Sequence, residues 1–113
     1  MPGPWGGVVA TPREVEFERE AGIRVRWRRS EAPPPYTYSV TVEVLGEDAS
    51  WTTARLWDNA DDVNEHHVHQ YTRRNGKQKP VVREFISINE AMATAIVEAR
   101  RDAVEIVREW EQS

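Results

Sequence analysis

The stretch that begins at Tyr36 and ends at Gly46 constrains the fold more than any other part of the chain, because aromatic or apolar residues alternate with polar ones from Tyr36 to Val44. The aromatic and apolar side chains occupy every second position: Tyr36, Tyr38, Val40, Val42 and Val44. A period of two residues is typical of a β-strand with one face buried and one face in water. Such a strand needs partner strands and a covering layer, so the sequence predicts a sheet with one packed face.

Further strand signals lie on both sides of this stretch. Val15 and Phe17 alternate with charged residues, as do Ile23, Val25 and Trp27 beyond Ala21-Gly22. These two runs predict a first hairpin with one wet face. Ala32-Pro33-Pro34-Pro35 cannot continue a ladder and is expected to be a connecting loop. A further strand is expected from Trp51 to Trp57.

A second hairpin is predicted in the histidine-containing half of the chain. His66 to Arg73 forms one candidate strand, and Pro80 to Ile86 forms the returning strand. Between them, Arg74-Asn75-Gly76-Lys77 supplies the Asn-Gly pair that type I′ hairpin turns favour.

A long helix is predicted at the C-terminal end. Ser87-Ile88-Asn89-Glu90 has the spacing of a capping box, and nothing from there to Gln112 breaks a helix. One apolar stripe follows this helix: Ile88, Met92, Ala95, Ala99, Ala103, Ile106 and Trp110. Val97, Val104 and Val107 widen the apolar arc, which indicates a deep core or a second buried surface against a dimer mate or another partner.

These elements together predict an α+β fold. We expect an antiparallel sheet of five or six strands in a hairpin meander, with the one long C-terminal helix packed on one face. The 113 residues suit one domain, which we place at residues 13–113 after a flexible Pro/Gly-rich tail at 1–12. No basic segment precedes the first apolar residues, so no signal peptide is expected.

Composition limits the cellular compartments and the kinds of binding site that we expect for this chain. The chain has no cysteine, which excludes disulfides and thiolate metal sites. It has no apolar stretch near the ~20 residues that a membrane helix requires. A soluble, cytoplasmic protein is therefore expected. The net charge of −4 argues against binding nucleic acid through overall charge.

The three histidines of the chain are the most informative residues for function. His66, His67 and His69 lie within four positions, and imidazole is the side chain whose unperturbed pKa lies in the physiological range. In an extended strand His67 and His69 point to one face, and His66 points to the other with Val68. The same part of the chain is net basic, because five basic residues follow the histidines: Arg73, Arg74, Lys77, Lys79 and Arg83.

A row of this kind has the groups required for RNA cleavage without a metal or any other cofactor. His67 and His69 can act as general base and general acid, and Arg73 can stabilise charge on the phosphate. Tyr71 can stack on a base or share in proton transfer. Arg74 and Lys77 extend the basic strip that would bind the RNA backbone. The same residues also suit RNA binding without cleavage, so whether the protein is an enzyme stays open.

Three other interpretations compete with this one. The histidines can be ordinary exposed residues of a sheet. They can also bind a metal, with a carboxylate from Asp58, Asp61, Asp62 or Glu65, although the spacing matches no strict metal motif. Finally, the chain can be a non-enzymatic interaction module, a homodimer or a partner-binding protein, that uses its wide helix and Trp110.

The stretch Leu56-Trp57-Asp58-Asn59-Ala60, followed within ten residues by His66, His67 and His69, resembles the TumE-like toxin components of prokaryotic toxin–antitoxin systems. The resemblance covers roughly residues 36–100. Trp57 stands where the family more often has Tyr, and residues 61–65 lack the prolines and extra histidines common there.

The resemblance implies a small α+β protein, a cytoplasmic growth inhibitor that acts on RNA and is encoded beside an antitoxin with a helix-turn-helix. It marks Asp58, Asn59 and the three histidines as signature positions. Asp58 would then orient an imidazole through a hydrogen bond, and Asn59 would contact RNA or serve as a turn residue. We therefore expect a toxin-like, RNA-acting protein with two sets of site residues. The catalytic set is His67, His69, His66, Asp58 and Tyr71, and the RNA-binding set is Arg73, Arg74, Lys77 and Asn59.

Overall fold

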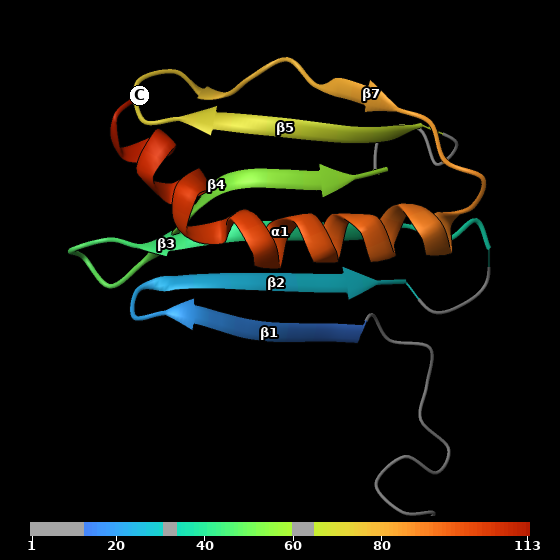
Figure 1. Ribbon diagram of the computed structural model, residues 1–113, viewed down its shortest axis with the longest axis horizontal. Coiled ribbons are helices and arrows are strands. Elements are labelled where there is room, and N and C mark those ends of the chain that lie inside the picture. Colours follow the sequence, from blue (N-terminus) through green and yellow to red (C-terminus); the bar gives the residue numbers. More distant parts are fainter. Residues whose placement is uncertain (1–12, 31–33, 60–64) are drawn as a thin grey trace, which may run out of the picture.

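The computed structural model describes residues 13–30, 34–59 and 65–113 (Figure 1). The expected tail at 1–12, part of the proline loop, and the candidate carboxylates Asp61 and Asp62 lie outside the described residues. Within the described ranges, no helix is long and apolar enough to cross a membrane.

An antiparallel sheet forms the larger layer of the structure (Figure 1). Five strands are neighbours in chain order: β1 (Arg13–Glu20), β2 (Ile23–Arg29), β3 (Tyr38–Leu45), β4 (Trp51–Asp58) and β5 (His66–Thr72). Two short strands, β6 (Gly76–Lys77) and β7 (Val81–Arg83), both pair with β5. The helix α1 (Ile88–Glu111) lies across the middle strands, so the predicted α+β fold is confirmed.

Two hairpin turns use glycines with positive φ. Gly22, between β1 and β2, has φ 79°, and Gly76, after β5, has φ 69°. The hairpin after β5 is confirmed, but its predicted turn type is wrong. Thr72 pairs with Gly76, which leaves a three-residue loop. A type I′ turn needs positive φ at both central residues, and Ala49 is the only non-glycine residue in the described ranges with that conformation.

The start of α1 follows the predicted capping box. The Oγ of Ser87 accepts a hydrogen bond of 3.1 Å from the Glu90 backbone N–H. The Glu90 side chain reaches one residue further back than in the standard capping box, because its Oε1 accepts a bond of 3.3 Å from the backbone N–H of Ile86, the residue before the Ser87 N-cap. These bonds satisfy donors that have no partner within the helix, so they fix the point where the helix begins.

Small side chains bring α1 close to the sheet. Its buried residues are mainly alanines: Ala91, Ala95, Ala99, Ala103, Ile106 and Val107. Because an alanine ends at Cβ, the helix backbone approaches Val25, Val40 and Val42, which have no exposed surface. The predicted stripe is confirmed, but Val97 is wrongly included in the arc because it is 60% exposed. The sheet accounts for the buried face of this helix.

A β-bulge divides β4 into two parts that face differently. Val42 pairs with Arg55, and Glu43 pairs with Thr53. Ala54 is therefore an extra residue in β4 that has no pairing partner in β3. An extra residue reverses the alternation of side chains beyond it. Trp51 accordingly stacks with Arg24 on one face, while the Trp57 indole N–H donates to Glu98 of α1 on the other. The bulge therefore sets the face that Asp58 occupies.

Glu98 joins three elements of the fold. It accepts hydrogen bonds of 2.6 and 3.0 Å from the Arg83 guanidinium of β7 and one of 3.3 Å from Trp57 of β4. The bonds from Arg83 lower the pKa of the Glu98 carboxyl. This ion pair attaches the β7 edge of the sheet to α1.

Candidate functional site

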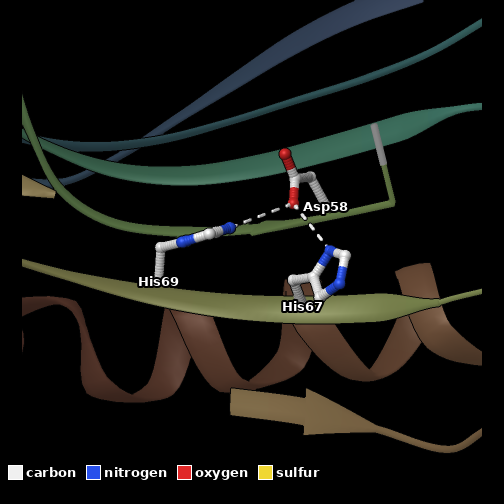
Figure 2. A group of neighbouring side chains, drawn as sticks. All are labelled: Asp58, His67 and His69. Carbon is white, nitrogen blue, oxygen red and sulfur yellow. Dashed lines mark ion pairs between the residues drawn. The ribbon is translucent and has the colours of Figure 1, made fainter. Parts of the chain in front are cut away.

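Asp58, His67 and His69 meet on the sheet face opposite α1 (Figure 2). Asp58, the last residue of β4, pairs directly with His67, the second residue of β5. Their neighbours Trp57 and Val68 pair with each other and pack into the core beneath the helix. Because side chains alternate along a strand, Asp58, His67 and His69 share the other face. The predicted orientation of the two histidines is therefore confirmed.

The three side chains converge on one point. Oδ1 of Asp58 lies 3.9 Å from Nδ1 of His67 and 3.8 Å from Nε2 of His69. All three atoms lie within 4.8 Å of one another. The side chains of Asp58, His67 and His69 are only 9%, 7% and 5% exposed. The structure thus buries two imidazoles and a carboxylate together.

Hydrogen bonds on the outer side fix both imidazole rings. Nε2 of His67 donates a bond of 2.9 Å to Oε1 of Glu65. Nδ1 of His69 donates a bond of 3.2 Å to the backbone carbonyl of Gln78. A carboxylate and a carbonyl only accept hydrogen bonds, so these outer ring nitrogens carry the protons. In the neutral rings, the inner nitrogens then present lone pairs toward Asp58.

Asp58 itself does not orient the histidines in the expected way. Its distances to the two inner nitrogens exceed the 2.7–3.2 Å of a hydrogen bond. Among the described residues, Nδ1 of His67 and Nε2 of His69 have no hydrogen-bond partner, although both are buried. Glu65 and Gln78 hold the rings instead. The convergent atoms can therefore accept a cation or share a proton.

His66 lies apart from this cluster, on the helix side of β5. Its Nδ1 and the Tyr38 hydroxyl share a hydrogen bond of 3.1 Å, and its ring meets the Phe85 ring edge-on. Burial raises the pKa of Tyr38 to about 12, with a contribution from the Asp58 charge. Burial also lowers the pKa of His66. His66 and Tyr38 thus form a neutral pair that belongs to the core.

Asn59 has a structural task that occupies its side chain. Its Oδ1 accepts a bond of 2.9 Å from the Tyr38 backbone N–H, and its Nδ2 donates one of 3.2 Å to the Tyr36 carbonyl. The residue has no exposed surface. Asn59 therefore connects the end of β4 to the start of β3, and it is not placed to contact RNA as the sequence suggested.

The expected basic strip lies away from the histidines. Arg73 follows the end of β5, where it stacks with Trp110 and donates to the Glu111 carbonyl. At about 3.3 Å per residue, the span from His67 to Arg73 is roughly 20 Å. Arg74 and Lys77 are exposed. The turn after β5 lies close to the C-terminus of the chain, where the Arg73 backbone N–H donates to the Ser113 hydroxyl (Figure 1). Tyr71 is half-buried on β5, two residues beyond His69. The structure therefore separates the RNA-binding candidates from the cluster.

The two groups that accept hydrogen bonds from the histidine rings are not predicted from the sequence. Glu65 is predicted there only as a metal ligand. Glu65 lies two residues before His67, and this spacing puts two residues of a strand on one face, so it indicates that Glu65 can contact the His67 ring. Gln78 contributes only its backbone carbonyl, which any residue carries, so no side-chain pattern indicates it.

The fold and site together define an α+β sheet protein with a buried His/His/Asp centre. No family model, curated protein or solved structure matches the chain. Its function is therefore argued from the site.

Proposed function

We propose that this protein is a toxin-like protein that acts on RNA, with Asp58, His67 and His69 as its reactive centre. One observation carries the assignment of the centre: two buried imidazoles, with their outer nitrogens already hydrogen-bonded, direct their inner nitrogens at one carboxylate. Buried ionisable groups held in such a fixed arrangement are characteristic of functional sites. The RNA target, the cytoplasmic location and a helix-turn-helix antitoxin come from the resemblance to TumE-like toxins.

The structure favours a mechanism different from the two-imidazole scheme. In that scheme each imidazole must reach an oxygen of the RNA. The inner nitrogens of His67 and His69 are buried and point toward Asp58, and their outer nitrogens are bonded to Glu65 and Gln78. Both rings therefore direct their inner nitrogens at the same point, so they would act together on one group or ion bound beside Asp58. Arg74 and Lys77 would contact the RNA backbone at a distance from it.

Induced expression in a bacterial host tests this proposal. Wild-type protein is expected to arrest growth and change the pattern of total RNA. The His67→Ala/His69→Ala variant should do neither, while remaining soluble and folded by circular dichroism. A His66→Gln variant is the matched control, because it removes the neighbouring histidine on the opposite face. Growth arrest that persists in the double variant, or normal growth with folded wild-type protein, would refute the proposal.

A second candidate function is protein interaction, and the β7 edge of the sheet favours it. Val81 and Val82 of β7 are 62% and 53% exposed, and Ile86 beyond it is 92% exposed. Within the described ranges β7 pairs only with β5, so its outer edge can accept another strand. Trp110, by contrast, packs against the core, so the helix is not the free face.

Size-exclusion chromatography with light scattering separates the two candidates in part. An obligate dimer or complex predicts a mass above that of one 13.0 kDa chain, reduced to the monomer by Ile86→Lys. A monomer at micromolar concentration argues against self-association.

A further inference from the structure

We infer that Asp58, His67 and His69 bind one divalent transition-metal ion. The inference deepens the proposed function by giving its centre a cofactor, and it rests on that proposal only in taking the same three residues as the centre.

Three electron-pair donors face one another when both imidazole rings are neutral and Asp58 is ionised. The outer N–H groups of both histidines are committed to Glu65 and to the Gln78 carbonyl. In neutral rings, Nδ1 of His67 and Nε2 of His69 are then acceptors, and so is the carboxylate oxygen of Asp58. Buried acceptors that point at one another repel, unless a cation lies among them. A metal ion accepts all three lone pairs at once.

Protonation of the rings explains the distances less well. An imidazolium N–H next to a buried carboxylate closes to about 2.7–2.9 Å, because the pair is charge-assisted. The distances here are 3.9 Å to His67 and 3.8 Å to His69. They instead leave a gap between the donors. Metal–ligand bonds of about 2.1 Å at tetrahedral angles put ligand atoms roughly 3.4 Å apart. The two distances to Asp58 must therefore shorten by about 0.5 Å, and the histidine nitrogens, which lie within 4.8 Å of each other, must approach by at most about 1.4 Å.

The surroundings also match those of metal-bound histidines. Such histidines almost always donate their other ring N–H to a carboxylate or a backbone carbonyl, which fixes the tautomer. Glu65 provides the first kind of partner for His67, and Gln78 provides the second for His69. Burial of all three side chains lowers the competition from bulk water.

The types of ligand atom at the centre determine which metal ions it can bind. Two imidazole nitrogens and one carboxylate oxygen suit Zn²⁺, Fe²⁺, Co²⁺ and related ions, whereas Mg²⁺ and Ca²⁺ prefer oxygen ligands. Three protein ligands leave at least one coordination position for water or a substrate, as in catalytic zinc sites and in 2-His-1-carboxylate iron sites.

Metal titration of purified, untagged, chelator-treated full-length protein tests the inference in the absence of RNA. Isothermal titration with Zn²⁺ should give one ion per chain, and Co²⁺ should give the visible absorption bands of a bound, low-symmetry site. His67→Ala and His69→Ala should each weaken Zn²⁺ binding by more than about 100-fold. His66→Gln, the matched histidine control, should leave both the stoichiometry and the Co²⁺ bands unchanged.

The outcomes separate this inference from the proposed function. Absence of stoichiometric binding in the wild type, or binding that survives in His67→Ala and His69→Ala, would overturn it. Should an alanine variant fail to fold, the wild-type Co²⁺ spectrum decides: bands of a nitrogen- and oxygen-ligated site support the inference, and the spectrum of hexaaqua Co²⁺ refutes it. Because no RNA is present, a negative result leaves growth inhibition to its own experiment.

Discussion

Glu65 accepts a hydrogen bond of 2.9 Å from Nε2 of His67, and this bond leaves Nδ1 of the same ring facing Asp58. The Glu65 side chain is about half exposed, so its removal should not disturb the core. The effect of removing Glu65 on the Asp58, His67 and His69 centre can therefore be measured without a large change in the stability of the protein.

Glu65→Ala should weaken Zn²⁺ binding by between about 10- and 100-fold, because the His67 ring loses the acceptor that fixes its tautomer. The measurement is competitive titration against a chelator of known affinity. Glu84→Ala is a suitable control, since Glu84 is also an exposed acid near the β7 edge. Equal affinity of Glu65→Ala and wild-type protein would show that the bond does not support metal binding.

Asn59→Ala should destabilise the protein by about 2 kcal/mol, because the Tyr38 N–H and the Tyr36 carbonyl lose their side-chain partners. Urea unfolding measures this change in the free energy of unfolding. Asn75→Ala, at an exposed turn position, should change it by less than about 0.5 kcal/mol. If Asn59→Ala were as stable as the wild type but lost RNA binding, the structural role of Asn59 would be wrong.

Glu98→Gln should cost about 1–2 kcal/mol at pH 7, because it replaces the charged partner of the partly exposed Arg83 guanidinium. The folded-state pKa of Glu98 lies below its ordinary value of 4.5. The stability that the charge provides is therefore fully present above that value, and it is lost as the pH falls through the lower, folded-state pKa.

The difference in unfolding free energy between wild type and Glu98→Gln should accordingly shrink below pH 4.5. Urea unfolding at pH 7 and at several values below 4.5 checks this dependence. Glu105→Gln, at an exposed position of the same helix, controls for net charge. A difference that stays constant with pH would contradict the ion-pair explanation.

Ala99→Leu should destabilise the fold by about 1–3 kcal/mol, because Ala99 has no exposed surface and the helix lies against the sheet there. Val97→Leu adds one methylene on the 60% exposed side of the same helix and should be nearly neutral. Thermal or urea unfolding compares the two variants. Similar stabilities would show that α1 is less closely packed than the alanine stripe indicates.

Much of the fold is predictable because local signals agree with the tertiary structure. The alternation around Val40 and Val42 identifies β3, and the capping box at Ser87 places the start of α1. The shared face of His67 and His69 follows from the period of a strand. In each case the pattern lies within one element, so no long-range information is needed.

The remainder depends on relationships between elements. Alternation alone puts Trp51 and Trp57 on one face, and the bulge at Ala54 places them on opposite faces. Likewise, the sequence suggested that Arg73 continues the histidine row, but β5 ends at Thr72 and Arg73 turns toward Trp110. Neither outcome has a clear local signal, because each depends on contacts with distant residues.

The extra residue at Ala54 also affects how relatives of this chain should be recognised. A protein can carry the aspartate and both histidines in order and still lack the centre, if its fourth strand is one residue shorter. The carboxylate would then project beneath the helix while the imidazoles project away from it. In an alignment, a gap within that strand therefore changes the face of the sheet on which the aspartate lies. The number of residues between Trp51 and Asp58 is as informative about the centre as the identity of its three side chains.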